Sequence, residues 1–262
     1  MNLLEPLLYN SIWVFMVVLA RVSPLLMMMP PLRGPSIPMR IRAMIGIGLA
    51  SMITPLVIDR ATAMPSSFPM LAVAVICELL LGLILGVIVS LIIGGMQMGG
   101  QFISQIGSME MADSNDALDD SPMNVISQLF GWIAIALFLF LGGHRELLGG
   151  FLQSFERYPA GTVTFQEHWL TLAVELVVDS LVIGIRIGAP VAVALLLANL
   201  ITALLARTVP QINILAVGFN INAMVMLIMI FASVGGIGFA FQEELANWLQ
   251  YTSQLWDSSA SI

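Results

Sequence analysis

The stretch LLLGLILGVIVSLIIGGMQMGGQFISQIGSM, Leu79 to Met109, decides the fold class. Its 31 residues carry no charged side chain, and twelve Leu, Ile and Val fall between Leu79 and Ile93. Such a run favours membrane insertion by about 6 kcal/mol, which a single Arg costing about 3 kcal/mol would not cancel. As one helix it would be about 46 Å long, beyond a hydrocarbon core of about 30 Å. We therefore expect a membrane-type helix that tilts, breaks or leaves the bilayer plane.

The composition of the whole chain excludes an ordinary soluble globule. Of its 262 residues, 59% are hydrophobic and 10% are charged, and the mean hydropathy is +0.98, whereas soluble domains carry about 25% charged residues. A chain this apolar needs lipid or partner subunits to cover its surface. We expect an all-α polytopic membrane protein with about six long apolar segments arranged as helical hairpins. The segments run from Leu3 to Leu32, Ile41 to Ile58, Phe68 to Met109, Met123 to Gly143, His168 to Ala206 and Ile212 to Phe241.

The charged residues are few and mostly acidic. The chain has nine Arg, no Lys and sixteen Asp and Glu, which gives a formal net charge of -7. Nucleic acid is excluded as a partner, because no basic face exists to displace phosphate counterions. Cys77 is the only cysteine and lies in an apolar run, which predicts a small buried hydrophobic side chain.

No pattern points to catalysis, a metal ion or a cofactor. The sequence contains no GxSxG, HExxH, P-loop or GxGxxG pattern. His144 and His168 have no metal-like spacing to each other or to Cys77. We therefore expect neither an enzyme nor a bound cofactor.

Small residues recur at helical spacing in two of the apolar segments. Such ridges let helix backbones approach closely, which is how helices associate when lipid removes the hydrophobic driving force. We therefore expect both ridges to be packing faces. The first consists of Gly82, Gly86, Ser90 and Gly94, and the second of Ala232, Gly236 and Ala240.

Three charged residues, Glu175, Asp179 and Arg186, form a charged seam on one face of the fifth segment. Exposure to lipid would cost several kcal/mol, so the seam is expected to face protein or water. Two interpretations stay open: a proton relay or conduit lining, and, favoured here, a charge pair that locks this helix to a neighbouring chain. Arg21 and Glu78, each isolated in an apolar stretch, are likewise expected to pair with other subunits.

The connection between the third and fourth segments changes composition abruptly. It reads GQFISQIGSMEMADSNDALDDSP from Gly100 to Pro122, with four apolar side chains ahead of five acids. The acids do not form a calcium loop, because counting from Asp113 as the first position puts Leu118 where a glycine is required. The connection is either a solvated acidic loop or a mobile segment that occludes an apolar opening.

Several stretches together resemble the FliR family of export-gate subunits, also called SpaR or EscT in injection systems. The clearest is ARTVPQINILAVGFNIN, Ala206 to Asn222, which is similar to an Arg-x-x-Pro-Gln-hydrophobic-Asn signature followed by Gly-Phe, and the aliphatic run before it fits the helix that leads into it. ARVSPLLMMMPPLRGPSIPMRIRAMIGIGLASMITP, Ala20 to Pro55, and FLGGHRELLGGFLQSFERYPAG, Phe140 to Gly161, resemble the N-terminal and central patterns. The likeness covers nearly the whole chain in register. The residues marked by it as family motif and subunit contact are Arg207, Pro210, Gln211, Asn213 and Gly218.

The resemblance implies a fold like a fusion of two sister subunits, FliP-like over residues 1–165 and FliQ-like over residues 166–262. It also implies an export gate, assembled with FliP-type and FliQ-type subunits, that passes unfolded protein substrates across the bacterial inner membrane at the flagellar basal body. FlhB-type and FlhA-type export proteins and membrane lipid are further implied partners.

The resemblance also implies a pore plug between Phe102 and Asp120. Its apolar stopper would consist of Phe102, Ile106, Met109 and Met111. The sequence GSMEMADSNDALDDSP departs here from the usual Met-Gly-hydrophobic run and Asp-Pro, and Phe219-Asn220 stands where Phe-Pro is usual.

A second function remains open from the residues alone. A self-contained secondary transporter could use Glu175, Asp179 and Arg186 as its coupling site. Transporters usually show two matching halves with broken helices, and no convincing internal repeat is visible in this chain.

Overall fold

The computed structural model describes residues 4–29, 32, 37–107, 124–164, 168–208 and 214–257. Within these ranges the regular structure is helical and contains no strand, which confirms the predicted all-α class. The helices are α1 (Leu4–Met28), α3 (Met39–Val57), the short 3-10 helix η1 (Ile58–Arg60), α4 (Phe68–Ile106), α6 (Val125–Phe140), α7 (Gly143–Arg157), α8 (His168–Thr208) and α9 (Ile214–Asp257).

Five of these helices are long and apolar enough to cross a membrane. They are α1, α3, α4, α8 and α9. A sixth span is reached only if α6 and α7 count as one, and these two helices are bent by 66° relative to each other. The overlong third segment is one continuous helix of 39 residues, α4, so it does not break. Pro190 lies inside α8, which has 41 residues.

Two elements differ from the expectation because an apolar run locates only the apolar part of a helix. α7 lies in a stretch expected to be a connection, where Gly149 and Gly150 interrupt the apolar pattern. It forms because Leu147, Phe151 and Phe155 recur four residues apart and bury one face of an amphipathic helix. α9 likewise continues well past the expected end at Phe241, into a stretch that carries acids.

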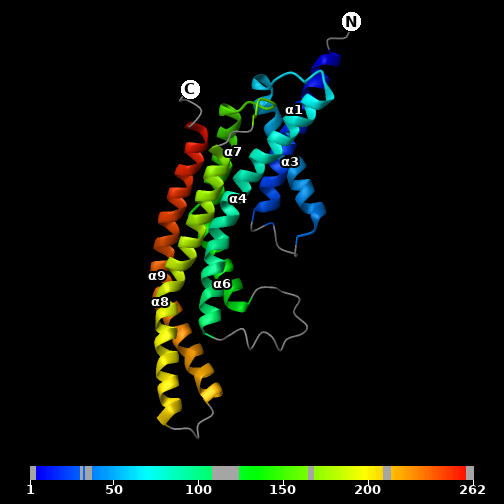
Figure 1. Cartoon of the computed structure of the whole chain (residues 1–262). Helices are drawn as coiled ribbons and strands as arrows, with labels where there is room; N and C mark the ends of the chain where they lie inside the picture. The colour runs from blue at the N-terminus through cyan, green and yellow to red at the C-terminus, as the bar shows by residue number, and fades with distance from the viewer. Residues whose placement is uncertain are drawn as a thin grey trace. The chain divides into compact units, whose positions relative to one another are not determined.

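The chain divides into two compact units, and each is described separately. Unit 1 comprises Met1–Leu91, Gly142–Leu176 and Asn247–Ile262. Its helices α1 and α3 lie side by side (Figure 1). The buried side chains of unit 1 come from α1, α3, the first half of α4, α7 and the start of α8, and include Trp13, Val17, Leu85, Phe151 and Trp169. Cys77 is among these buried residues, as predicted.

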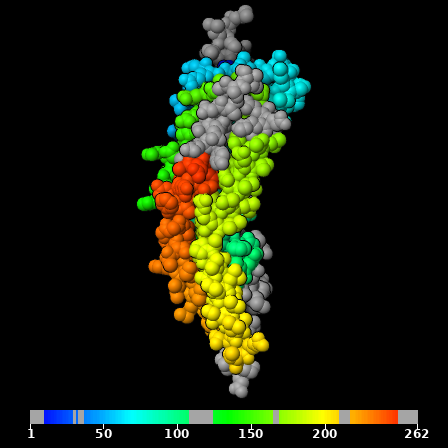
Figure 2. Space-filling model, turned by 60° about the vertical axis from the view of Figure 1, so that its left-hand side comes forward, coloured from blue at the N-terminus to red at the C-terminus, as the bar shows by residue number. Residues whose placement is uncertain are grey.

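Unit 2 comprises Ile92–Leu141 and Val177–Ala246. Figure 2 shows α8 and α9 side by side along one face of this unit. The second half of α4 packs on α6 and α8. Its core includes Met96, Phe130, Phe138, Leu195 and Phe241, all almost fully buried.

Glycines bring backbones into direct contact in both units. A Cβ on Gly82 would collide with the carbonyl oxygen of Arg21 on α1, so the predicted ridge packs at this point. Gly94 of the same ridge has no neighbour within 4 Å. In unit 2 the close approach is made by Gly99, where a Cβ would lie 2.8 Å from the carbonyl oxygen of Gly184 on α8. Two faces of α4 therefore make close approaches, one to α1 through Gly82 in unit 1 and one to α8 through Gly99 in unit 2.

Candidate functional site

A buried ion pair joins three helices of unit 1. Arg21 on α1 and Glu78 on α4 are both fully buried, and the Arg21 Nε donates to Glu78 Oε2 at 2.5 Å. The other guanidinium nitrogens are also used: Nη1 donates to Ser154 Oγ and Nη2 to the carbonyl oxygen of Tyr158, each at 3.0 Å. The guanidinium carbon lies 4.0 Å from the centre of the Phe155 ring. We call these groups the Arg21 network.

The second carboxylate oxygen of Glu78 binds the turn after α7. Its Oε1 accepts a hydrogen bond of 2.8 Å from the backbone nitrogen of Gly161. Gly161 has a φ of 87°, and an added Cβ would lie 2.5 Å from Thr62 Oγ1, so only glycine suits this position. Thr62 in turn donates through its backbone nitrogen and its hydroxyl to the carbonyl oxygen of Ala160.

The expectation that Arg21 and Glu78 pair with other subunits is therefore wrong. They pair with each other inside the chain, because α1 and α4 cross at the small residue Gly82. Every charged and polar atom of the pair has a partner, which is what a buried pair needs to offset its desolvation. The Arg21 network is a structural anchor.

The last turns of α4 carry the described part of the predicted stopper. Phe102 is 44% exposed, and its ring would lie 3.5 Å from a Cβ on Gly188 of α8. Ile106 is the last residue of α4 and is partly buried. Met109 and Met111 lie outside the described residues.

Two side-chain amides hold the end of α4, and the sequence analysis missed them. Asn199 on α8 donates from Nδ2 to the carbonyl oxygen of Ile106 at 3.1 Å. Asn222 on α9 donates from Nδ2 to Asn199 Oδ1 at 2.7 Å and to the carbonyl oxygen of Gly107 at 3.4 Å. We call Asn199 and Asn222 the amide pair. The signal in the sequence was a lone Asn inside the uncharged aliphatic block that follows Pro190.

The amide pair leaves one acceptor without a partner. Asn222 is 3% exposed, and its Oδ1 has no hydrogen bond among the described residues. A buried polar group without a partner costs about 1–3 kcal/mol. The amide cannot be turned round to remedy this, because the carbonyl oxygen of Gly107 and Oδ1 of Asn199 can only accept hydrogen bonds.

The charged seam is only partly brought together. All three residues lie on α8, where Glu175 is exposed, Asp179 is partly exposed and Arg186 is exposed. Arg186 finds its ion-pair partner on α9, where its Nη1 lies 3.7 Å from Glu243 Oε2. Glu243 was not among the predicted seam residues. It lies two residues beyond Phe241, where the sixth apolar segment was expected to end.

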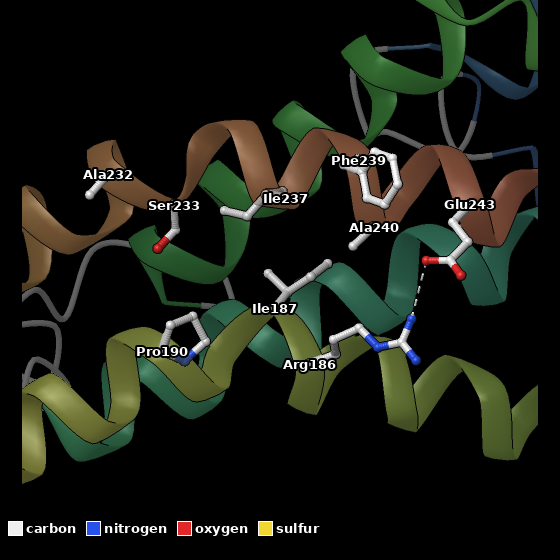
Figure 3. Close-up of a pocket in the computed structure, with 10 residues that line it drawn as sticks. Arg186, Ile187, Pro190, Ala232, Ser233, Ile237, Phe239, Ala240 and Glu243 are labelled. Carbon is white, nitrogen blue, oxygen red and sulfur yellow. Dashed lines mark ion pairs between the residues drawn. The ribbon is translucent and has the colours of Figure 1, made fainter.

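A groove between α8 and α9 opens beside this ion pair (Figure 3). It has a volume of about 520 Å³. The predicted small-residue ridge of α9 forms one of its walls, and a Cβ on Gly236 would meet nothing within 4 Å. The side chains lining it are largely apolar, with Arg186 and Glu243 at one end.

The remaining predicted residues stand at the connection between α8 and α9. Arg207 is exposed in the last turn of α8, and Gly218 is partly exposed in α9 with nothing within 4 Å of an added Cβ. Pro210, Gln211 and Asn213 lie outside the described residues. Among the described residues, no group of three or more His, Cys, Asp or Glu side chains could hold a metal ion.

Comparison with known proteins decides the family. Residues 12–248 match the family described as Bacterial export proteins, family 1. The chain belongs to this family. The match to bacterial export proteins of family 1 takes in the Arg21 network, the amide pair and the Arg186–Glu243 pair together.

Relatives in this export family carry the name that the sequence resemblance indicated. A flagellar biosynthetic protein FliR of Caulobacter vibrioides is 26% identical over 91% of this chain and 95% of its own length. FliR of Escherichia coli is 28% identical over 78% of this chain and 77% of its own length. FliR of Bacillus subtilis is 28% identical over 58% of this chain and 60% of its own length. The predicted resemblance to the FliR family is confirmed.

Proposed function

We propose that this chain is a structural subunit of the flagellar protein export gate. With FliP-type and FliQ-type subunits it forms the channel through which unfolded protein substrates cross the bacterial inner membrane at the basal body. The observation that carries the proposal is the match to bacterial export proteins over residues 12–248, together with the likeness to FliR of Caulobacter vibrioides over 91% of the chain. FlhB-type and FlhA-type export proteins are further partners in this proposal.

The surface of the chain supports a role inside an assembly. Phe68 of unit 1 is 82% exposed, and Phe140 and Phe231 of unit 2 are 88% and 85% exposed. Many other large apolar side chains on α3, α4, α8 and α9 are exposed as well, and exposed apolar surface on this scale marks a protein or membrane interface. The chain therefore requires neighbours, whether lipid or protein, along both units.

The Arg21 network supports a scaffold role for unit 1. All its polar atoms are bonded within the chain. A proton relay would need a group that can gain or lose a proton toward a pathway, and this fully paired site offers none. The exposed Arg186–Glu243 pair likewise gives no observation in favour of a buried coupling site for a secondary transporter.

Three finer assignments belong to the same proposal. Residues 1–165 act as the FliP-like part and residues 166–262 as the FliQ-like part. Phe102 and Ile106 form the described portion of the pore stopper. Contacts with the sister subunits are made through the family motif, which consists of Arg207, Pro210, Gln211, Asn213 and Gly218.

Deleting the chain tests the proposal in its native host. We expect cells without it to build no external filament and to secrete no flagellar substrate, and a plasmid copy to restore both. Normal filaments in the deletion strain would refute the gate assignment. Complementation with Asp179→Asn separates the gate from a transporter: a gate subunit retains export, whereas a transporter that couples through Asp179 loses its activity.

A further inference from the structure

We propose that the amide pair, Asn199 and Asn222, is a positioning element that ends α4 at Gly107 and fixes the resting orientation of Phe102 and Ile106. The inference rests on the proposed gate function, because it assigns a role to the end of α4 within that gate. Neither residue is among those that the resemblance marks as family motif and subunit contact.

The end of α4 needs hydrogen-bond donors from elsewhere. The last four carbonyl groups of a helix have no partner within that helix, and between apolar helices no water replaces the missing donors. Asn199 supplies a donor to the Ile106 carbonyl and Asn222 supplies one to the Gly107 carbonyl. Two carbonyl groups at the end of α4 are thus bonded to side chains of α8 and α9.

The amide pair links three helices in series. Asn222 on α9 donates to Asn199 on α8, and Asn199 donates to Ile106 on α4. Because the carbonyl groups can only accept, each amide has one permitted orientation. A displacement of α8 or α9 within unit 2 therefore changes the donors at the end of α4.

Packing alone does not explain this pair. Asn222 is almost fully buried, yet its Oδ1 has no hydrogen-bond partner among the described residues. A leucine of similar size would bring no unpaired acceptor of its own, so an amide is not needed merely to fill this space. The hydrogen bonds that Asn222 donates to Asn199 Oδ1 and to the Gly107 carbonyl explain why an amide stands at this position.

The last turns of α4 carry Phe102 and Ile106, the two side chains proposed as the described portion of the pore stopper. Phe102 and Ile106 both lie on α4, four residues apart. The Phe102 ring lies against Gly188 of α8. If the last turn frays, the direction in which both side chains point is no longer fixed. The expected consequence is a resting gate that passes small ions while it still exports protein.

Asn222→Leu is the decisive variant, and Asn220→Leu is its matched control. Asn220 is exposed on the same helix, two residues earlier. Both variants are made in the full chain and purified with the FliP-type and FliQ-type subunits. In Asn222→Leu the removal of the unpaired Oδ1 partly offsets the loss of the donor to Asn199 Oδ1 and to the Gly107 carbonyl, so we expect the complex to stay assembled.

Hydrogen exchange of the complex measures how firmly the last turn of α4 is held. In Asn222→Leu we expect amide protons of residues 103–107 to exchange about tenfold faster, as the loss of one buried hydrogen bond predicts. Exchange around Gly95 and in unit 1 should stay unchanged, and Asn220→Leu should match the unaltered chain. Unchanged exchange at residues 103–107 would overturn the positioning role. A general rise in exchange along α4, α8 and α9 would overturn it too, because that is the result of a merely structural role.

A leak measurement in cells tests the consequence for the gate. Cells that carry Asn222→Leu should depolarise, read with a potential-sensitive dye, while filament protein secretion stays within about twofold, since the substrate path is retained. Local fraying without depolarisation would overturn the role in the resting gate and leave the gate assignment intact. That assignment fails separately, if the deletion strain still exports.

Discussion

At the scale of single residues, the Arg21–Glu78 pair places two opposite charges out of contact with solvent inside unit 1. Two fully buried charges with no loose polar atom stabilise one arrangement of α1, α4 and α7. Removing one partner of such a pair is costly, whereas replacing both by apolar residues often is not. The two kinds of variant therefore have opposite expected outcomes.

We expect Glu78→Gln to lower the free energy of unfolding by about 3–5 kcal/mol, because it leaves the Arg21 guanidinium buried without a counter-charge. Thermal unfolding of the purified complex in detergent measures the change. The double variant Arg21→Met with Glu78→Leu should recover most of the loss.

The exposed ion pair between Arg60 and Glu156 is the control. Its atoms lie 3.5 Å apart and its side chains are 61% and 67% exposed. Arg60→Gln should therefore change stability by about 0–1 kcal/mol. An effect of Glu78→Gln as small as that of Arg60→Gln would contradict the anchoring role of the buried pair.

At the scale of elements, helix crossings in this chain depend on single glycines. Gly82→Ala should destabilise the complex by about 1–3 kcal/mol or more, because its Cβ would push against the backbone of α1 at Arg21. The thermal midpoint of the complex and the yield of assembled protein both report this change.

Gly94→Ala is the matched control on the same helix. No atom lies within 4 Å of its added Cβ, so alanine should gain up to about 1 kcal/mol from its better helix propensity. Equal destabilisation by both variants would mean that helix propensity, and not the crossing with α1, governs this part of α4.

Apolar runs predicted the existence and approximate bounds of six helices, because a long apolar segment can satisfy its backbone only as a helix. They could not predict α7, where Gly149 and Gly150 dilute the apolar face, nor the part of α9 that continues into charged sequence. Spacing also predicted one ridge on α4 where the helix has two packing faces, one toward α1 and one toward α8. A period of four drifts by about 40° per step around a helix, so Gly94 lies about 120° around α4 from Gly82 and meets no neighbour.

The spacing of residues in the sequence cannot predict polar contacts between distant parts of the chain. Arg21 and Glu78 are separated by 57 residues and Asn199 and Ile106 by 93. Arg21, Glu78 and Asn199 are each visible in the sequence as an isolated polar residue in an apolar stretch, which marks a site but does not identify its partner. The crossing of the helices decides which groups meet.

At the scale of the whole molecule, exposed aromatic side chains determine whether the isolated chain aggregates. Trp132 is 70% exposed, and Phe68, Phe140 and Phe231 are more exposed still. Purified alone in mild detergent, the chain should elute as aggregates in size-exclusion chromatography. Co-expressed with FliP-type and FliQ-type subunits, it should elute as one complex of fixed composition, because partner helices cover these side chains.

Lipid nanodiscs loaded with the chain alone provide the comparison. If lipid by itself covers the apolar surface, the chain will be monodisperse in nanodiscs and will gain no thermal stability from the sister subunits. That outcome would contradict the role proposed for it as a part of a larger channel.

Cys77 makes the chain its own reporter. It is the only cysteine, it is buried, and it directly precedes Glu78 on α4. A thiol reagent should reach it only when the packing around α4 in unit 1 opens, because a buried thiol is protected from modification. The rate at which Cys77 is alkylated therefore measures how often unit 1 opens, without any engineered probe.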